Sequence, residues 1–137
     1  MSNRFTKTFT AGREHIDVMG HVNNAVWVGW VQDMATAHWE AAARAEDQAS
    51  FIWLVIRHEI DYRGNIAVGD SVTGETWIPD GARGAKSTRR VDFTDAAGKV
   101  IVSANTTWAM LDRETGRLAR VRGEVMAPFA PPGPAAP

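Results

Sequence analysis

The sequence predicts an α+β fold in which a mainly antiparallel sheet wraps around one long helix. The first observation is that helical periodicity is sustained over one segment, residues 24–46, where large side chains recur at i, i+3, i+4, i+7 and i+11: Trp27, Trp30, Val31, Met34 and His38. The second observation is that the following residues form successive β-like patterns separated by Gly, Asn, Asp and Pro turns. A single long helix followed by strands buries its apolar stripe against the sheet.

The first third of the chain is expected to form a strand, a loop and the helix. Residues 4–12 alternate loosely around Phe5 and Phe9, which predicts the first strand. The loop covers residues 13–23, and Asn24 is expected to be the helix N-cap, because a carboxamide accepts hydrogen bonds from the free N–H groups at a helix start. On the exposed side of the helix, Glu40 and Arg44 are expected to form an i,i+4 ion pair.

Strands are expected in most of the remaining chain. Residues 52–62 predict a strand that alternates from Ile56 onward. One face is expected to carry Ile56, His58, Ile60 and Tyr62, and the other face Arg57, Glu59 and Asp61. Further strands are predicted at 71–78, 85–94 and 100–111, with a short one at 117–120. The turns between them are predicted at 64–65, 69–70, 79–81, 95–98 and 112–116.

Length and composition are typical of one globular domain, expected over residues 1–127 of the 137. Five of the six prolines lie from Pro128 onward, so residues 128–137 are predicted to be a disordered tail. A net charge of −1 gives no electrostatic basis for binding nucleic acid or an anionic membrane. The absence of cysteine excludes disulfides, thiolate metal sites and a cysteine nucleophile. Neither an apolar signal core nor a membrane-spanning run is found, so a cytoplasmic location is expected.

The loop before the helix concentrates side chains that can perform chemistry. Its run Asp17-Val18-Met19-Gly20-His21-Val22-Asn23-Asn24 contains a carboxylate, an imidazole and two carboxamides. A helix N-terminus presents unpaired N–H groups and a partial positive charge, which stabilise developing negative charge. This layout suits acyl transfer, with Asp17 as nucleophile or as a base toward water. The alternative is that Asp17 only caps a turn, which is common for Asp before Gly.

The same residues resemble the motif of the hotdog-fold thioesterases, both the 4-hydroxybenzoyl-CoA thioesterase-like acyl-CoA hydrolases and the plant acyl-ACP thioesterases. The resemblance rests on Asp17, Gly20-His21-Val22-Asn23-Asn24, Trp27, Gly29-Trp30, the run Ile56–Tyr62 and the turn Val68-Gly69-Asp70. It covers residues 4–127 and implies a hotdog fold and hydrolysis of a fatty or aromatic acyl-CoA. It also implies a homodimer or homotetramer with the active site at the subunit interface, and no cofactor. An acyl carrier protein thioester as substrate, or a non-catalytic acyl-thioester binding module, is the alternative.

The resemblance assigns catalytic roles to Asp17, His21 and Glu59. Asp17 matches the Asp that attacks the thioester in the benzoyl-type enzymes. His21 would hydrogen-bond the thioester carbonyl, assist proton transfer or hold the loop. Glu59 matches the strand carboxylate of the plant enzymes, but the Asn of that network falls on Met19, which forms no such hydrogen bond. The alternative for Glu59 is a pair with a neighbouring residue of the strand, Arg57 or His58.

Binding residues are expected in two groups. Around the loop, the backbone of Gly20 and the side chains of Asn23, Asn24 and Trp27 are expected to contact substrate. A basic edge is expected to hold the phosphorylated nucleotide of CoA, with a solvated surface as the alternative; it consists of Arg83, Lys86, Arg89 and Arg90. The main expectation for Trp27, Trp30 and Trp53 is a place in the core, and the alternative is that they line an acyl or aroyl pocket. No metal site is expected, because His15, Asp17 and His21 fall on an irregular loop.

Overall fold

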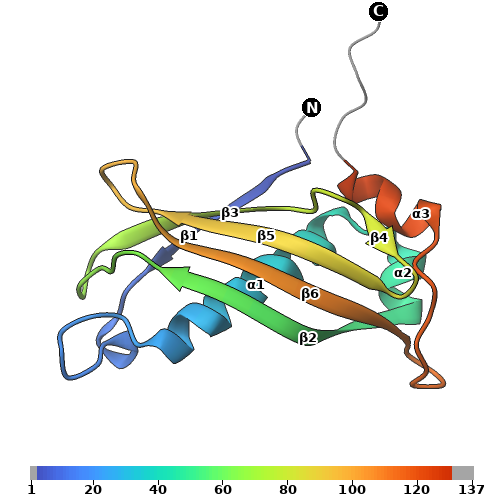
Figure 1. The fold of residues 1–137 in the computed structure, drawn as a ribbon, viewed down its shortest axis with the longest axis horizontal. Coiled ribbons are helices and arrows are strands. Elements are labelled where there is room, and N and C mark those ends of the chain that lie inside the picture. Colours follow the sequence, from blue (N-terminus) through green and yellow to red (C-terminus); the bar gives the residue numbers. More distant parts are fainter. Residues whose placement is uncertain (1–2, 131–137) are drawn as a thin grey trace, which may run out of the picture.

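The computed structural model describes residues 3–130, in which one six-stranded sheet curves around helix α1 (Asn24–Ala42), as Figure 1 shows. The strands are β1 (Phe5–Thr10), β2 (Phe51–Tyr62), β3 (Ser71–Trp77), β4 (Ala82–Arg83), β5 (Lys86–Thr94) and β6 (Val100–Asp112). Their order is β1-β3-β5-β6-β2, with β4 paired to β5, and every pair is antiparallel. The short helices are η1 (Arg13–His15), α2 (Ala45–Ser50), α3 (Gly123–Met126) and η2 (Ala127–Phe129). The predicted α+β class and the sheet wrapped around one long helix are confirmed.

The main core lies between α1 and the concave face of the sheet. Trp27, Trp30 and Met34 of α1 are buried there, and Trp27 packs on Phe93 of β5 with ring centroids 5.2 Å apart. The helix crosses the sheet so closely at Gly74 that a Cβ atom there would lie 2.7 Å from Met34 Sδ and 3.1 Å from Phe93 Cε1. A glycine at this position therefore sets the spacing between helix and sheet.

The helix ends earlier than predicted, at Ala42. The chain leaves it through extended backbone at Ala43 and Arg44 and enters α2. Arg44 forms an ion pair with the buried carboxylate of Asp47 at 2.9 Å, so the expected pair with Glu40 is wrong. Gln48 donates to the main-chain oxygens of Glu40 and Ala43, which satisfies free carbonyls at the end of α1.

Strand β2 contains a bulge that the alternation did not predict. The register with β6 shifts between Val55 and Arg57, so Ile56 is an extra residue and is exposed. Beyond the bulge the inner face carries His58 and Ile60, as predicted, and the placement of Ile56 with them is wrong. The predicted strand near 117–120 is reduced to a single bridge to Leu118, while β4 was not predicted.

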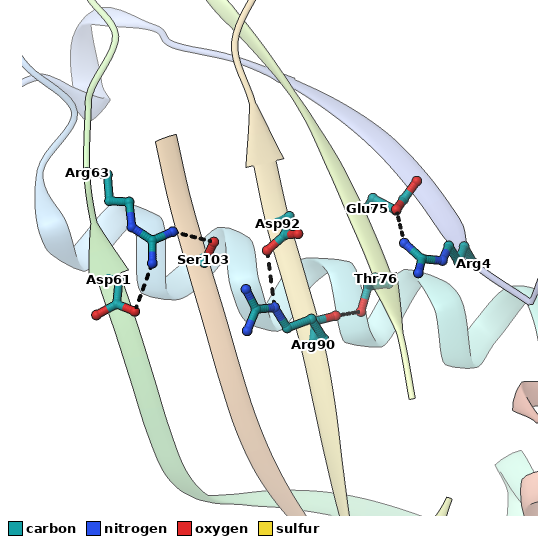
Figure 2. A network of polar contacts seen from close by, with 8 residues as sticks. All are labelled: Arg4, Asp61, Arg63, Glu75, Thr76, Arg90, Asp92 and Ser103. Atoms are coloured by element: carbon teal, nitrogen blue, oxygen red, sulfur yellow. Dashed lines mark hydrogen bonds and ion pairs between the residues drawn. The ribbon is translucent and has the colours of Figure 1, made fainter. Parts of the chain in front are cut away.

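The polar face of the sheet, opposite α1, carries the ion pairs drawn in Figure 2. Arg90 contacts Asp92 at 3.2 Å, and Arg63 contacts Asp61 at 3.6 Å and Ser103 at 3.4 Å. Exposed pairs of this kind contribute little to stability, about 0–1 kcal/mol each. They nevertheless show that cations on this face are matched to carboxylates.

The segment after Val121 returns to the fold. Phe129 is only 2% exposed and packs against the rings of His38 and Trp39. The prediction of a disordered tail from Pro128 is therefore wrong for Pro128 and Phe129, because one aromatic side chain anchors this stretch in a second apolar cluster. Residues 131–137 of the predicted tail lie outside the described residues. Within residues 3–130, no helix has the length and apolarity needed to cross a membrane.

Candidate active site

The loop before α1 is a tight turn closed by its own backbone. An antiparallel bridge joins Ile16 to Val22, and inside it the Asp17 N–H donates to the His21 carbonyl at 2.8 Å. The Gly20 N–H donates to the Asp17 carbonyl at 3.1 Å, with Gly20 at φ +80°. Only glycine adopts this left-handed conformation without strain, so Gly20 shapes the turn.

The Asp17 carboxylate faces this turn with one oxygen. Its Oδ1 accepts hydrogen bonds from the N–H groups of Met19 at 2.8 Å and His21 at 3.3 Å. This is the turn-capping geometry. No described residue hydrogen-bonds or pairs with Oδ2. One oxygen therefore holds the loop while the other is available to a reacting group.

Asn65, from the connection between β2 and β3, fixes the loop to the sheet. Its Oδ1 accepts from the Val22 N–H at 3.0 Å and from the Ile66 N–H at 2.8 Å, and its Nδ2 donates to the Val22 carbonyl at 3.1 Å. From the sequence, Asn65 was predicted only as a turn residue. Nothing in the local pattern indicates a contact with a segment 43 residues away.

The helix N-cap is Asn23, so the prediction of Asn24 is wrong. Asn23 has extended backbone, and its Oδ1 accepts from the Ala25 N–H at 2.8 Å. Asn24 is already the first helical residue. Its N–H has no acceptor among the described residues, and the helix dipole adds partial positive charge there. This N–H is thus the free donor at the helix start.

The tip of the loop is open to solvent. Val18 and Met19 are both exposed although they are apolar, and His21 is exposed with no hydrogen bond to its ring within residues 3–130. Adjacent exposed apolar side chains beside a carboxylate and an imidazole are typical of a surface that contacts a ligand or another chain.

Glu59 does not join this loop within one chain. It lies exposed on the outer face of β2, where its Oε1 is 3.5 Å from Nη2 of Arg57. No ion pair or hydrogen bond of the described part of the chain connects it to Asp17 or His21. The single chain therefore shows the pair with Arg57 that was the alternative for this residue.

His58, the neighbour of Glu59, points the other way, toward α1. Its Nδ1 lies 2.9 Å from Thr106 Oγ1 and its Nε2 lies 3.5 Å from Gln32 Nε2. Burial lowers the pKa of His58 below its usual value. From the sequence, His58 was predicted only as a member of the Ile60 face and as an alternative partner for Glu59. The sequence did contain a signal, because His58 is a polar residue at a position that strand alternation places on the inner face, next to apolar Ile60.

The tryptophans expected near the substrate belong to the interior. Trp27 is fully buried and packs edge-on against Trp30, with ring centroids 5.1 Å apart. The Trp27 indole N–H is buried without an acceptor among the described residues. Trp53 lies elsewhere, in a second cluster toward the C-terminal end of α1.

The residues of the expected basic edge do not lie together on one surface. Arg83 and Lys86 are exposed on the β4–β5 hairpin, near the opposite end of α1 from the Asp17 loop (Figure 1). Arg89 is 6% exposed, so its expected place on a surface edge is wrong. Strand alternation turns it inward together with Val91, because side chains two apart share a face. Within residues 3–130 no three His, Asp or Glu side chains are arranged to hold a metal ion.

Comparison with known proteins identifies relatives over almost the whole chain. A family model described as the acyl-ACP thioesterase N-terminal domain matches residues 2–129. The long-chain acyl-CoA thioesterase FadM of Escherichia coli (strain K12) is 26% identical over 121 residues, which cover 81% of this chain and 86% of FadM.

Two other relatives are longer than this chain. The chloroplastic acyl-[acyl-carrier-protein] hydrolase FATB3 of Cuphea viscosissima is 25% identical over 80 residues, 58% of this chain but only 19% of the plant protein. The crystal structure of an acyl-ACP thioesterase from Bacteroides thetaiotaomicron superimposes with a TM-score of 0.80 at 20% identity, covering 98% of this chain and 57% of that one. The chain thus spans a fifth of the plant protein and just over half of the bacterial one.

Proposed function

The chain belongs to the acyl-ACP thioesterase family, and from this membership we propose that it hydrolyses an acyl thioester to a free acid and a thiol. The observation that carries the proposal is that one oxygen of Asp17, in the loop just before α1, and the Asn24 N–H at the helix start have no hydrogen-bond partner among the described residues. Acyl-CoA is the preferred substrate, because the relative that matches along most of its own length is an acyl-CoA thioesterase. An acyl carrier protein thioester is the alternative, supported by the plant and Bacteroides relatives.

The proposed mechanism divides the work between these two groups. The thioester carbonyl oxygen accepts a hydrogen bond from the Asn24 N–H, which stabilises the charge that the oxygen gains. A single donor of this kind is typically worth ~3 kcal/mol in the transition state. In one route, Oδ2 of Asp17 attacks the carbonyl carbon and expels the thiolate, and water then hydrolyses the resulting mixed anhydride to the free acid and restores Asp17. In the other route, Oδ2 removes a proton from a water that attacks the carbonyl carbon, and the thiolate leaves as the free acid forms. His21 contacts the substrate from the exposed side of the loop.

The substrate screen is a thiol-release assay on acyl-CoAs of graded chain length, on benzoyl-CoA and phenylacetyl-CoA, and on acyl carrier proteins with matched acyl groups. We expect thiol release from at least one acyl-CoA, with higher kcat/KM than from the carrier protein with the same acyl group. Saturable binding of the thioesters without thiol release would instead identify a non-catalytic binding module. A preference for the carrier protein would make the alternative substrate correct.

We further propose that the chain assembles as a homodimer or homotetramer through strand β2. This strand lies at an edge of the sheet and exposes Ile52, Leu54 and Ile56. Light scattering at micromolar concentration is expected to show a dimer or larger species, and Leu54→Lys is expected to shift it toward monomer. Val68→Lys, at another exposed apolar residue, is the control that should not change the mass. A monomeric unmodified chain would contradict the assembly.

A further inference from the structure

A cavity of about 290 Å³ lies at the C-terminal half of α1, away from the Asp17 loop. Its walls come from α1, β2, β5, β6, α3 and η2, and none of residues 13–24 lines it. The large side chains around it are Trp39, Phe51, Trp53, Trp108, Met126 and Phe129. Most of the wall is therefore apolar and aromatic, as is usual for sites that hold small organic molecules.

One buried cation interrupts this apolar wall. Arg89 lines the cavity, is 6% exposed and keeps its charge at neutral pH, since burial lowers its pKa only to about 10. Its Nη1 donates to His38 Nδ1 at 2.8 Å and to Thr76 Oγ1 at 3.2 Å. Burial and the charge of Arg89 lower the pKa of His38 to about 4, so this ring is neutral and can accept the hydrogen bond. Neither partner supplies a negative charge.

Among residues 3–130, Arg89 is the one arginine that is buried. Arg4, Arg63 and Arg90 in Figure 2 each contact a carboxylate, although they are far more exposed than Arg89. No carboxylate of residues 3–130 forms an ion pair with Arg89. The Phe129 ring, whose centroid is 5.9 Å from Cζ, provides a cation–π contact but no negative charge. A buried cation without a counter-ion is costly, which favours an anion supplied from outside the chain.

Several other donors in the cavity wall also lack acceptors. No described residue accepts a hydrogen bond from Nε or Nη2 of Arg89, which together form one edge of the guanidinium. The indole N–H groups of Trp53 and Trp108 are buried without an acceptor in the described part of the chain. The one acidic lining residue, Glu40, is exposed on α1 and makes no ion pair with Arg89, and Arg113 of the same lining offsets its charge.

We propose that this cavity binds an amphipathic carboxylate, with its carboxylate on the Nε–Nη2 edge of Arg89 and its aromatic or short aliphatic body among the tryptophan rings. A planar guanidinium edge matches the two oxygens of a carboxylate. A cavity of about 290 Å³ is at the lower end of the range for organic ligands, which favours a small acid over a long chain. The inference goes beyond thioester hydrolysis and does not depend on it.

The test is a binding measurement without catalysis. Phenylacetate and octanoate are titrated into the full chain by calorimetry, with indole fluorescence as a second readout, because Trp39, Trp53 and Trp108 surround the cavity. Phenylacetamide and octanamide have the same bodies without the charge. We expect saturable binding of the acids and at least about tenfold weaker binding of the amides, as is typical for a lost charge-assisted hydrogen bond.

Variants assign the binding to Arg89. Arg89→Gln should abolish the preference for acid over amide, whereas Arg90→Gln, the neighbouring arginine on the opposite face, should leave it unchanged. If Arg89→Gln fails to fold, Thr36→Trp offers a second route, since Thr36 is exposed on α1 and lines the cavity mouth, and it should block both acids. Asp17→Asn should bind the acids normally, which separates this site from the loop. Equal binding of acids and amides, no binding of the acids, or equal loss in Arg90→Gln would overturn the proposal.

Discussion

Asp17→Asn is expected to lower kcat by at least about a hundredfold while the fold is retained. Asn keeps an Oδ1 that accepts from the N–H groups of Met19 and His21, so the turn can keep its shape. The change replaces Oδ2 by an NH₂ group, which neither attacks a thioester nor takes a proton from water. The measurement is steady-state thiol release on the best substrate of the screen, with a thermal melt to check folding.

Two further measurements interpret the loss. A non-hydrolysable acyl-CoA analogue should bind Asp17→Asn about as well as the unmodified chain, because the Asn24 N–H is unchanged. Glu59→Gln tests the strand carboxylate, whose contact within the chain is the exposed pair with Arg57. A greater loss in Glu59→Gln than in Asp17→Asn would make Glu59 the principal catalyst. Full turnover in Asp17→Asn would refute the proposed mechanism.

Phe129→Ala is expected to lower the free energy of unfolding by roughly 3–5 kcal/mol, the usual range for removing a fully buried phenylalanine. The ring lies 4.8 Å from that of His38 and is stacked 5.7 Å from that of Trp39. Its removal leaves a cavity that these neighbours fill only in part. Urea unfolding followed by tryptophan fluorescence gives the difference directly.

Truncation after Ala127 should reproduce most of the loss in Phe129→Ala, since it removes the same ring. Leu118→Ala is the matched control, because Leu118 is a large apolar residue that is exposed, and the expected change is within about 0.5 kcal/mol. If the truncated chain were as stable as the full chain, η2 would not contribute to the core, and the packing described around His38 would be wrong.

The fold class was predictable because it depends on one sustained helical periodicity and on β-like segments separated by turn residues. Spacing of 3.6 along α1 identified its buried face, and the turns between β-like segments marked the limits of β3, β5 and β6. What failed depends on individual contacts, one between strands distant in sequence and one between residues three apart. The bulge at Ile56 follows from pairing with β6, and the end of α1 follows from the ion pair of Arg44 with buried Asp47. Neither partner is marked in the local pattern.

The candidate site was likewise predictable where it depends on adjacent residues and not where it depends on distant contacts. The compact motif from Asp17 to Asn24 was recognisable because its residues are adjacent in sequence, and the loop remains the proposed catalytic centre. The prediction for Arg89 was wrong because a cluster of basic residues in the sequence was assumed to form one surface. Alternation along β5 places Arg89 and Arg90 on opposite faces. Asn65 was missed because a turn carboxamide normally bonds its own turn.

The hydrogen bonds between Asn65 and Val22 have a practical consequence for experiments that exchange segments between members of this family. The carboxamide holds both backbone groups of Val22, so residues 16–24 and residues 64–66 form a single unit, although they are far apart in the sequence. A chimera that receives only residues 16–24 contains a loop whose hydrogen-bonding partner, residue 65, comes from a different protein. Grafts that move both segments together should preserve the position of the loop.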